Sequence, residues 1–305
     1  TQTGITGWVT GTGKTFNFTN STTSYDRLRL TITDNQAHDG SLYRVGEVYF
    51  YDWLPFPYTI PNSTHTILVY NQTDAGDWVV PTGVTNIRLL VVGGGGNGGN
   101  SAGGGGGAGG VISYDAYSVS PGEIWNISVG GSHANSSFNK GTVIQNIAWR
   151  GGNGGISTVA NPENGGSGGG AHGSATDATT GGTGLAGQGF GGGDNGGNKT
   201  FPYPAGGGGG NQSVGTDATD ATHAGDGGNG WYSDITGTPQ IYAKGGGGAI
   251  HVDGPYFAGV GGNGGIGGNN GTVGAGVAGS GVTGTGDGGG GCGGGGTPGT
   301  GAGGT

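Results

Sequence analysis

Residues 76–96 read GDWVVPTGVTNIRLLVVGGGG, and this stretch joins the two kinds of sequence from which the chain is built. Residues 1–92 hold 8 of the 87 glycines, and the other 79 follow in the remaining 213 residues. Glycine has no side chain to bury and loses the most backbone entropy on folding. Interactions other than side-chain packing must therefore order the second part.

The sequence before Gly93, and for some way beyond it, alternates apolar and polar residues with a period of two. Leu28, Leu30 and Ile32 fall on one face, and residues 43–50 repeat the pattern. This alternation predicts half-buried antiparallel strands, arranged as a β-sandwich or a jelly-roll-like unit. Further strands are predicted over Thr66–Tyr70, Trp78–Val80, Thr85–Val92, Val111–Tyr117, Ile124–Val129 and Thr142–Trp149.

The glycine runs fit neither an amphipathic helix nor a sheet whose register is set by side chains. They can form polyglycine-II helices, with three residues per turn and a rise of about 3.1 Å per residue. Several such helices side by side can exchange backbone hydrogen bonds where the contacting residues lack a Cβ. The predicted fold class is therefore all-β, followed by a polyglycine-II bundle. The predicted divisions are residues 1–60, 61–150 and 151–305.

Aromatic residues interrupt the later glycine runs in three places, at residues 198–205, 229–244 and 249–260. Exposed aromatic rings bind sugars and anchor protein contacts, so these interruptions are the candidate receptor-binding loops. The alternative interpretation is that the rings only cap the bundle hydrophobically. The candidates are Phe201, Tyr203, Trp231, Tyr232, Tyr242, Tyr256 and Phe257.

The charge balance argues against several classes of partner. Nine Lys and Arg face 18 Asp and Glu, for a net charge of −9, whereas nucleic-acid binders need a concentrated basic surface. No apolar run approaches the roughly 20 residues of a membrane-spanning helix. We therefore expect neither a nucleic-acid partner nor membrane insertion.

Sequence patterns typical of catalysis or metal binding carry little weight in this chain. The TGTGKT stretch at residues 10–15 lacks the first glycine and the helix context of a P-loop. The six histidines show no zinc-ligand spacing. Asp217, Asp220, His223 and Asp226 form either a solvated stripe or half of a site completed by another segment. We predict a non-enzymatic protein with no catalytic residue, metal or cofactor.

Nine N-x-S/T acceptors occur, about twice the number that composition predicts by chance. They indicate a glycosylated, exported surface. The alternative is that a chain rich in Asn, Ser and Thr contains such triplets by chance. Opening on Thr1 suggests a secreted chain with a processed N-terminus, and the lone Cys292 excludes an internal disulfide. The glycosylation candidates are Asn17, Asn20, Asn62, Asn71, Asn126, Asn135, Asn198, Asn211 and Asn270.

The stretch from Trp78 to Val84, WVVPTGV, with the strand and glycine run that follow, resembles the glycine-rich domain of phage tail and bacterial surface proteins. Residues 108–111, 119–122 and 127–131 resemble the next strands of that domain. The later glycine blocks resemble the polyglycine-II bundle of T-even-type long-tail-fibre tip adhesins. That likeness implies receptor recognition by the loops between glycine blocks. Residues 26–53 resemble, more distantly, the closing strands of a discoidin-type sandwich.

Three functional hypotheses follow. The first is a virion or cell-surface fibre protein that attaches to a host glycan or outer-surface protein. The second is a structural subunit of an extracellular filament or coat, packed against identical subunits or other fibre proteins. A distant third is an ice-binding protein, since some of these also use polyglycine bundles. All three place the protein outside the cell or on a virion surface.

Overall fold

The computed structural model describes residues 58–59, 65–71, 76–156, 162–174, 176–177, 179–197, 200–251, 257–262, 277–294 and 296–300. Internal contacts divide the chain into two units, Thr1–Tyr51 and Asp52–Thr305, and every described residue belongs to the second. The strands expected over residues 28–50, and the discoidin-like segment, lie outside the described residues. The divisions at residues 60 and 150 stay predictions.

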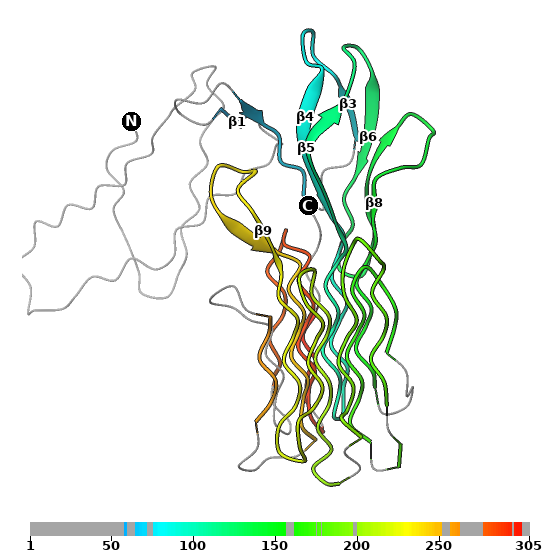
Figure 1. Cartoon of the computed structure of the whole chain (residues 1–305), viewed down its shortest axis with the longest axis vertical. Coiled ribbons are helices and arrows are strands. Elements are labelled where there is room, and N and C mark those ends of the chain that lie inside the picture. The colour runs from blue at the N-terminus through cyan, green and yellow to red at the C-terminus, as the bar shows by residue number, and fades with distance from the viewer. Residues whose placement is uncertain are drawn as a thin grey trace, which may run out of the picture. The chain divides into compact units, whose positions relative to one another are not determined.

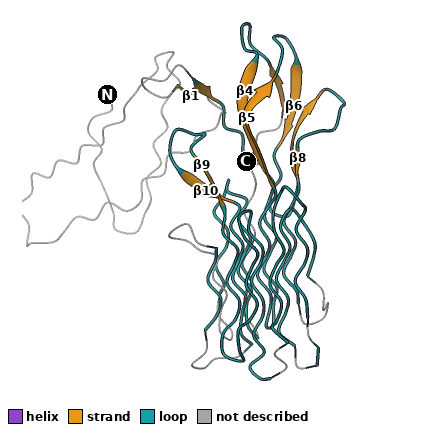
Figure 2. Ribbon diagram, in the orientation of Figure 1, coloured by secondary structure: helices purple, strands orange, loops and turns teal. Residues whose placement is uncertain are grey.

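The described residues form strands and no helix, so the predicted all-β class is confirmed (Figure 2). This part of the chain accordingly holds no helix that is long and apolar enough to span a membrane. The strands are β1 (Tyr58–Thr59), β2 (Thr66–Ile67), β3 (Gly76–Val79), β4 (Asn86–Val92), β5 (Val111–Ser118), β6 (Ile124–Ser128), β7 (Ser136–Lys140), β8 (Ile147–Ala148), β9 (Trp231–Ser233) and β10 (Gln240–Tyr242).

The main sheet is antiparallel, in the order β3-β6-β7-β8, and β4 pairs with β5 beside it. Alternation in β6 turns Trp125 and Ile127 inward, while Ile124 and Asn126 face solvent. The ring of Trp125 stacks on Phe138 of β7, with centroids 4.5 Å apart and planes 6° apart. Val91 of β4 joins the same buried cluster. The two sheets therefore share one sandwich-like core.

Four of the strands predicted in this region are confirmed within two residues at each end: β3, β4, β5 and β6. The predicted strand Thr142–Trp149 is reduced to β8, because Lys140 turns back to pair with Val143 and Gly141 adopts a φ of 54°. The predicted strand Thr66–Tyr70 is likewise reduced to β2. Strand β7 was not predicted, since SSFNK carries one large apolar residue.

Glu123, in the turn before β6, carries a hydrogen-bond network that predicts a pH effect on stability. Its carboxylate accepts from Lys140 Nζ at 2.6 Å, from the Ser120 backbone N–H at 3.0 Å and from Trp125 Nε1 at 3.2 Å. The Lys140 bond first, and then the Ser120 bond, lower the pKa of Glu123 from 4.5 to about 2.

We expect the stabilisation from Glu123 to be present above pH 4.5 and to be lost as the pH falls through about 2, because the unfolded chain takes up the proton first. An NMR titration of the carboxyl carbon should give a midpoint near pH 2, and the Glu123→Gln variant should lack this part of the acid dependence. A midpoint near 4.5 would contradict the network.

Beyond the sheets, the glycine runs lie side by side, and segments far apart in the sequence are neighbours (Figure 1). Strand β4 continues directly into residues 93–99, and residues 103–110 return into β5. The two runs bond at every third residue: Gly93 donates to Gly110 O at 2.9 Å, Gly96 to Gly107 O at 2.8 Å, and Gly99 to Gly104 O at 2.8 Å.

Successive residues of run 103–110 donate to three different neighbouring runs. One set of every third residue faces residues 286–292, the next faces residues 149–155, and the third faces residues 206–209. The backbone directions therefore repeat with a period of three. The bonds run from Gly103, Gly106 and Gly109 to Cys292, Gly289 and Gly286; from Gly104, Gly107 and Gly110 to Gly155, Gly152 and Trp149; and from Gly105 and Ala108 to Gly206 and Gly209.

At the glycine positions that face neighbouring runs, the spacing leaves no room for a side chain. A Cβ added at Gly106 would overlap the carbonyl oxygen of Gly96 and lie 2.8 Å from the carbonyl carbon of Asn97. A Cβ at Gly105 would overlap the carbonyl of Gly246. The obstructing atoms are backbone on both sides and cannot rotate away. Close backbone contact thus explains why this part of the sequence is glycine.

Candidate functional site

The aromatic interruptions divide between the two ends of the glycine runs. The distal end is the one remote from the sheets, where residues 100–102 reverse the first glycine run. Backbone bonds join the turns there: Gly173 donates to Ala102 O at 2.8 Å, His251 to Pro202 O at 3.1 Å, and Gly294 to His251 O at 2.7 Å. Two of the three interruptions therefore contribute to the distal end.

We call Phe201, Tyr203, His223, His251 and Phe257 the distal face. Phe201 and Tyr203 meet edge to face with centroids 5.7 Å apart, and Tyr203 lies 6.2 Å from His251. His223 stacks on Phe257 at 4.5 Å, with 9° between the planes. Phe201 and Phe257 remain 55% and 59% exposed. The distal face thus presents two aromatic groups to solvent.

Asp220 supports the second of these groups. It accepts from the Thr222 hydroxyl at 2.6 Å and contacts His223 Nδ1 at 3.0 Å. The Thr222 hydroxyl bond, followed by the His223 bond, lowers the pKa of Asp220 below its usual range. The Asp220 carboxylate therefore stays ionised while it orients the ring that stacks on Phe257.

The acidic stripe predicted around His223 consists largely of backbone caps. Asp217 accepts from the Asp194 backbone N–H at 2.7 Å, and Asp226 accepts from the Val260 N–H at 2.8 Å. Among the described residues, His, Cys, Asp and Glu form no group of three that could hold a metal ion. The stripe ties neighbouring runs together at their loops.

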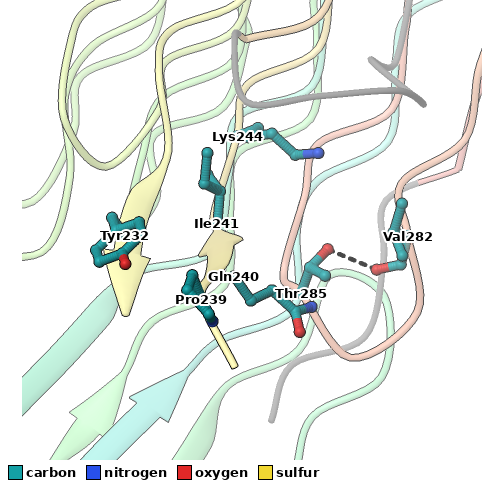
Figure 3. Close-up of a pocket in the computed structure, with 7 residues that line it drawn as sticks. All are labelled: Tyr232, Pro239, Gln240, Ile241, Lys244, Val282 and Thr285. Carbon is teal, nitrogen blue, oxygen red and sulfur yellow. Dashed lines mark hydrogen bonds between the residues drawn. The ribbon is translucent and has the colours of Figure 1, made fainter. Parts of the chain in front are cut away.

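The remaining interruption forms the β9–β10 hairpin at the end nearest the sheets. In its register Trp231 lies opposite Tyr242 and Tyr232 opposite Ile241. Tyr232 is 61% exposed and lines a hollow of about 400 Å³ with Ile241 and Lys244 (Figure 3). Trp231 borders a separate cleft. The adjacent residues Trp231 and Tyr232 therefore line two different cavities.

Several predicted candidates differ in their surroundings. Tyr242 is only 3% exposed and packs with Val92 and Val111, so it is a core residue without surface for a receptor, and burial raises the pKa of its phenol. Tyr256 lies outside the described residues. The distal face also includes His223 and His251, which were not among the receptor-binding candidates predicted from the sequence.

The predicted glycosylation sites differ in how exposed their side chains are. Asn71, Asn126 and Asn135 are exposed. Asn211 is 9% exposed, and its Nδ2 donates to the Gln188 carbonyl, so a sugar there would have to replace that bond. Five candidates lie outside the described residues: Asn17, Asn20, Asn62, Asn198 and Asn270.

Lys244 and Asp287 form a buried ion pair that sequence reasoning missed. Their side chains are 7% and 0% exposed, and Lys244 Nζ lies 3.3 Å from Asp287 Oδ2. The Lys244 backbone N–H also donates to Asp287 Oδ1 at 2.9 Å. Burial raises the pKa of Asp287, and Lys244 opposes that effect. Each residue precedes four glycines, the one shared signal in the sequence.

Comparison with known proteins gives a match to a family model. The model of a family described as a glycine-rich domain matches residues 71–305. No curated protein and no solved structure matches the chain. The match spans β3 to β10, the glycine runs and the distal face.

Proposed function

Because the chain belongs to the glycine-rich domain family, we propose that it is a non-enzymatic attachment protein of a virion or cell-surface fibre. Its glycine runs form a rigid support, and its distal face contacts a host receptor or glycan. The observation that carries the proposal is the pair of exposed aromatic groups, assembled from separate loops at the end of the runs. The proposal assigns no catalytic residue.

We further infer that the glycine runs are polyglycine-II helices. A threefold helix directs successive N–H groups about 120° apart, which accounts for the three neighbours contacted by residues 103–110. No glycine from Gly93 to Gly110 has a φ in the left-handed region. Cross-bonding in several directions would hold the distal turns in fixed relative positions. A fixed face loses less entropy on binding than flexible loops would.

Exposed aromatic rings on a fixed support suit receptor contact. Burying Phe201 and Phe257 in a partner removes large apolar surfaces from water. Anchors of this kind carry most of the binding energy in protein interfaces. The His and Asp side chains beside them add hydrogen-bonding groups that can select among partners.

We expect Phe201→Ala combined with Phe257→Ala to weaken attachment at least about tenfold, because anchor residues each contribute roughly 1–2 kcal/mol or more. Flow cytometry with the fluorescently labelled full chain on native host cells measures this. Tyr232→Ala is the matched control, since Tyr232 is equally exposed but lies on the β9–β10 hairpin. Equal binding by all three proteins would contradict a distal attachment site.

A structural subunit remains the second candidate, favoured by apolar side chains on the outer surface of the glycine runs. Val214, Val260 and Val277 are 56%, 52% and 78% exposed. Packing identical copies along these residues would bury them. Sedimentation of the full chain distinguishes this function: a concentration-dependent filament or oligomer that Val277→Asp disrupts would support it, and a monomer at all concentrations would contradict it.

A further inference from the structure

A cleft of about 530 Å³ lies between β5, the turn at residues 184–191 and the start of β9. This size is within the range of small-molecule sites. Phe190 and Trp231 contribute aromatic rings, Ser113 and Gln212 contribute polar side chains, and glycine backbone supplies much of the remaining lining. It is separate from the distal face, because Trp231 belongs to the hairpin nearest the sheets.

The aromatic walls of this cleft are held in place. Trp231 packs against the buried cluster that contains Val92, Val111 and Tyr242, so its ring is supported from behind. The Phe190 backbone N–H donates to Gly210 O at 3.1 Å, and its carbonyl accepts from Gly168 at 3.0 Å. The Phe190 side chain itself is 45% exposed. The Trp231 ring is therefore held by packing, and the Phe190 ring, on a hydrogen-bonded backbone, is accessible to a ligand.

Two amide side chains lock the turn that closes the cleft. Gln188 accepts from the Trp149 backbone N–H at 2.9 Å and donates to Ile147 O at 2.8 Å. Asn211 donates through Nδ2 to the Gln188 carbonyl, and its backbone N–H donates to Ala243 O at 3.0 Å. The cleft is thus formed before any ligand arrives, which lowers the cost of binding.

The lining selects the chemistry of the ligand. Among the residues that the structure describes, the lining includes no charged side chain, so these residues offer nothing to neutralise a phosphate or a carboxylate. A purely apolar ligand would cover the Gln212 amide and the Ser113 hydroxyl without giving them partners, which costs free energy. The ligand must therefore combine apolar faces with neutral hydroxyl groups.

We propose that this cleft binds a neutral oligosaccharide. The C–H faces of pyranose rings stack on Trp231 and Phe190, because aromatic rings carry negative charge on their faces. The hydroxyls of the sugar exchange hydrogen bonds with Gln212, Ser113 and exposed backbone groups. This inference goes beyond distal attachment: it assigns a second site and a ligand class, and it holds whether or not the distal face binds a receptor.

The test titrates the full chain with maltopentaose, cellopentaose and chitopentaose, and with trigalacturonic acid as the charged comparator. Saturation-transfer NMR detects contact, and calorimetry gives the affinity. We expect at least one neutral sugar to bind with a Kd on the order of 1 mM or tighter, and trigalacturonic acid to bind more weakly. No neutral sugar binding at ten times that concentration, or equal binding of the charged sugar, would overturn the proposal.

Two kinds of variant locate the site. Ala186→Trp fills the cleft from an exposed position, and Phe190→Ala removes one aromatic wall; each should weaken binding roughly tenfold or more. Phe257→Ala, on the distal face, should leave sugar binding unchanged. Sugar binding that survives Ala186→Trp would overturn the assignment, whereas loss of cell attachment alone in the Phe257 variant bears only on the distal site.

Discussion

Gly106→Ala is expected to destabilise the folded chain by about 3 kcal/mol or more, a large effect for the addition of one methyl group. Gly106 lies where several runs meet: it donates to Gly289 O at 2.8 Å and accepts from Gly246 at 2.9 Å. The added Cβ would overlap the carbonyl of Gly96. Relief requires separating runs that are joined by backbone hydrogen bonds.

Alanine ordinarily stabilises a position relative to glycine, because it restricts the unfolded chain. The expected loss therefore runs against the usual effect and reports on close packing alone. Gly76→Ala is the matched control: a Cβ at Gly76 has nothing within 4 Å, and its φ is not positive. We expect that variant to change stability by no more than about 0.5 kcal/mol.

Urea unfolding of the two variants and the parent, followed by tryptophan fluorescence, gives the free energies. A similar small effect for both variants would mean that the runs are spaced more widely than described, and the inferred polyglycine-II bundle would lose its main support.

The strands near the glycine boundary were predictable because local pattern and tertiary role agree in them. In β6, Trp125 and Ile127 are followed at the same spacing by Val129, and this period of two predicts the strand, although apolar Ile124 on the other face is exposed. Strand β7 lacks this signal. Its place depends on Phe138 stacking on Trp125 and on buried Ser136 accepting from the Gly130 N–H at 3.0 Å. Both contacts are tertiary.

The aromatic interruptions could be identified in the sequence. The sequence did not predict which of them lie at the distal end of the glycine runs and which lie at the end nearest the sheets. Each run can travel toward or away from the sheets, and neighbouring glycine sequences give no register by which to choose. In the fold, the turn at residues 211–213 returns the chain toward Asp220, whereas residues 224–230 lead into the β9–β10 hairpin. Only the complete hydrogen-bond pattern sets these directions.

Asp287→Asn is expected to lower stability by about 3 kcal/mol, because it leaves the Lys244 ammonium buried without a counter-charge. The substitution preserves the shape of the side chain and an oxygen for the Lys244 backbone N–H, so the charge is the main change. Asp234→Asn provides the control: its partner Arg88 lies 3.0 Å away, but the two side chains are 60% and 47% exposed. Exposed pairs of this kind contribute about 0–1 kcal/mol.

A double variant separates the ion pair from the packing around it. Replacing Lys244 with Met and Asp287 with Leu removes both charges while keeping most of the volume, and such replacements are often neutral or stabilising. We expect the double variant to be more stable than Asp287→Asn and than Asp287→Leu, because both single changes leave Lys244 buried without a counter-charge. A mutant cycle with Lys244→Met and Asp287→Leu as the single variants should therefore show strong non-additivity. If the double variant is less stable than Asp287→Asn, the buried charges are themselves required to join run 245–248 to run 288–291, and desolvation does not dominate at this position.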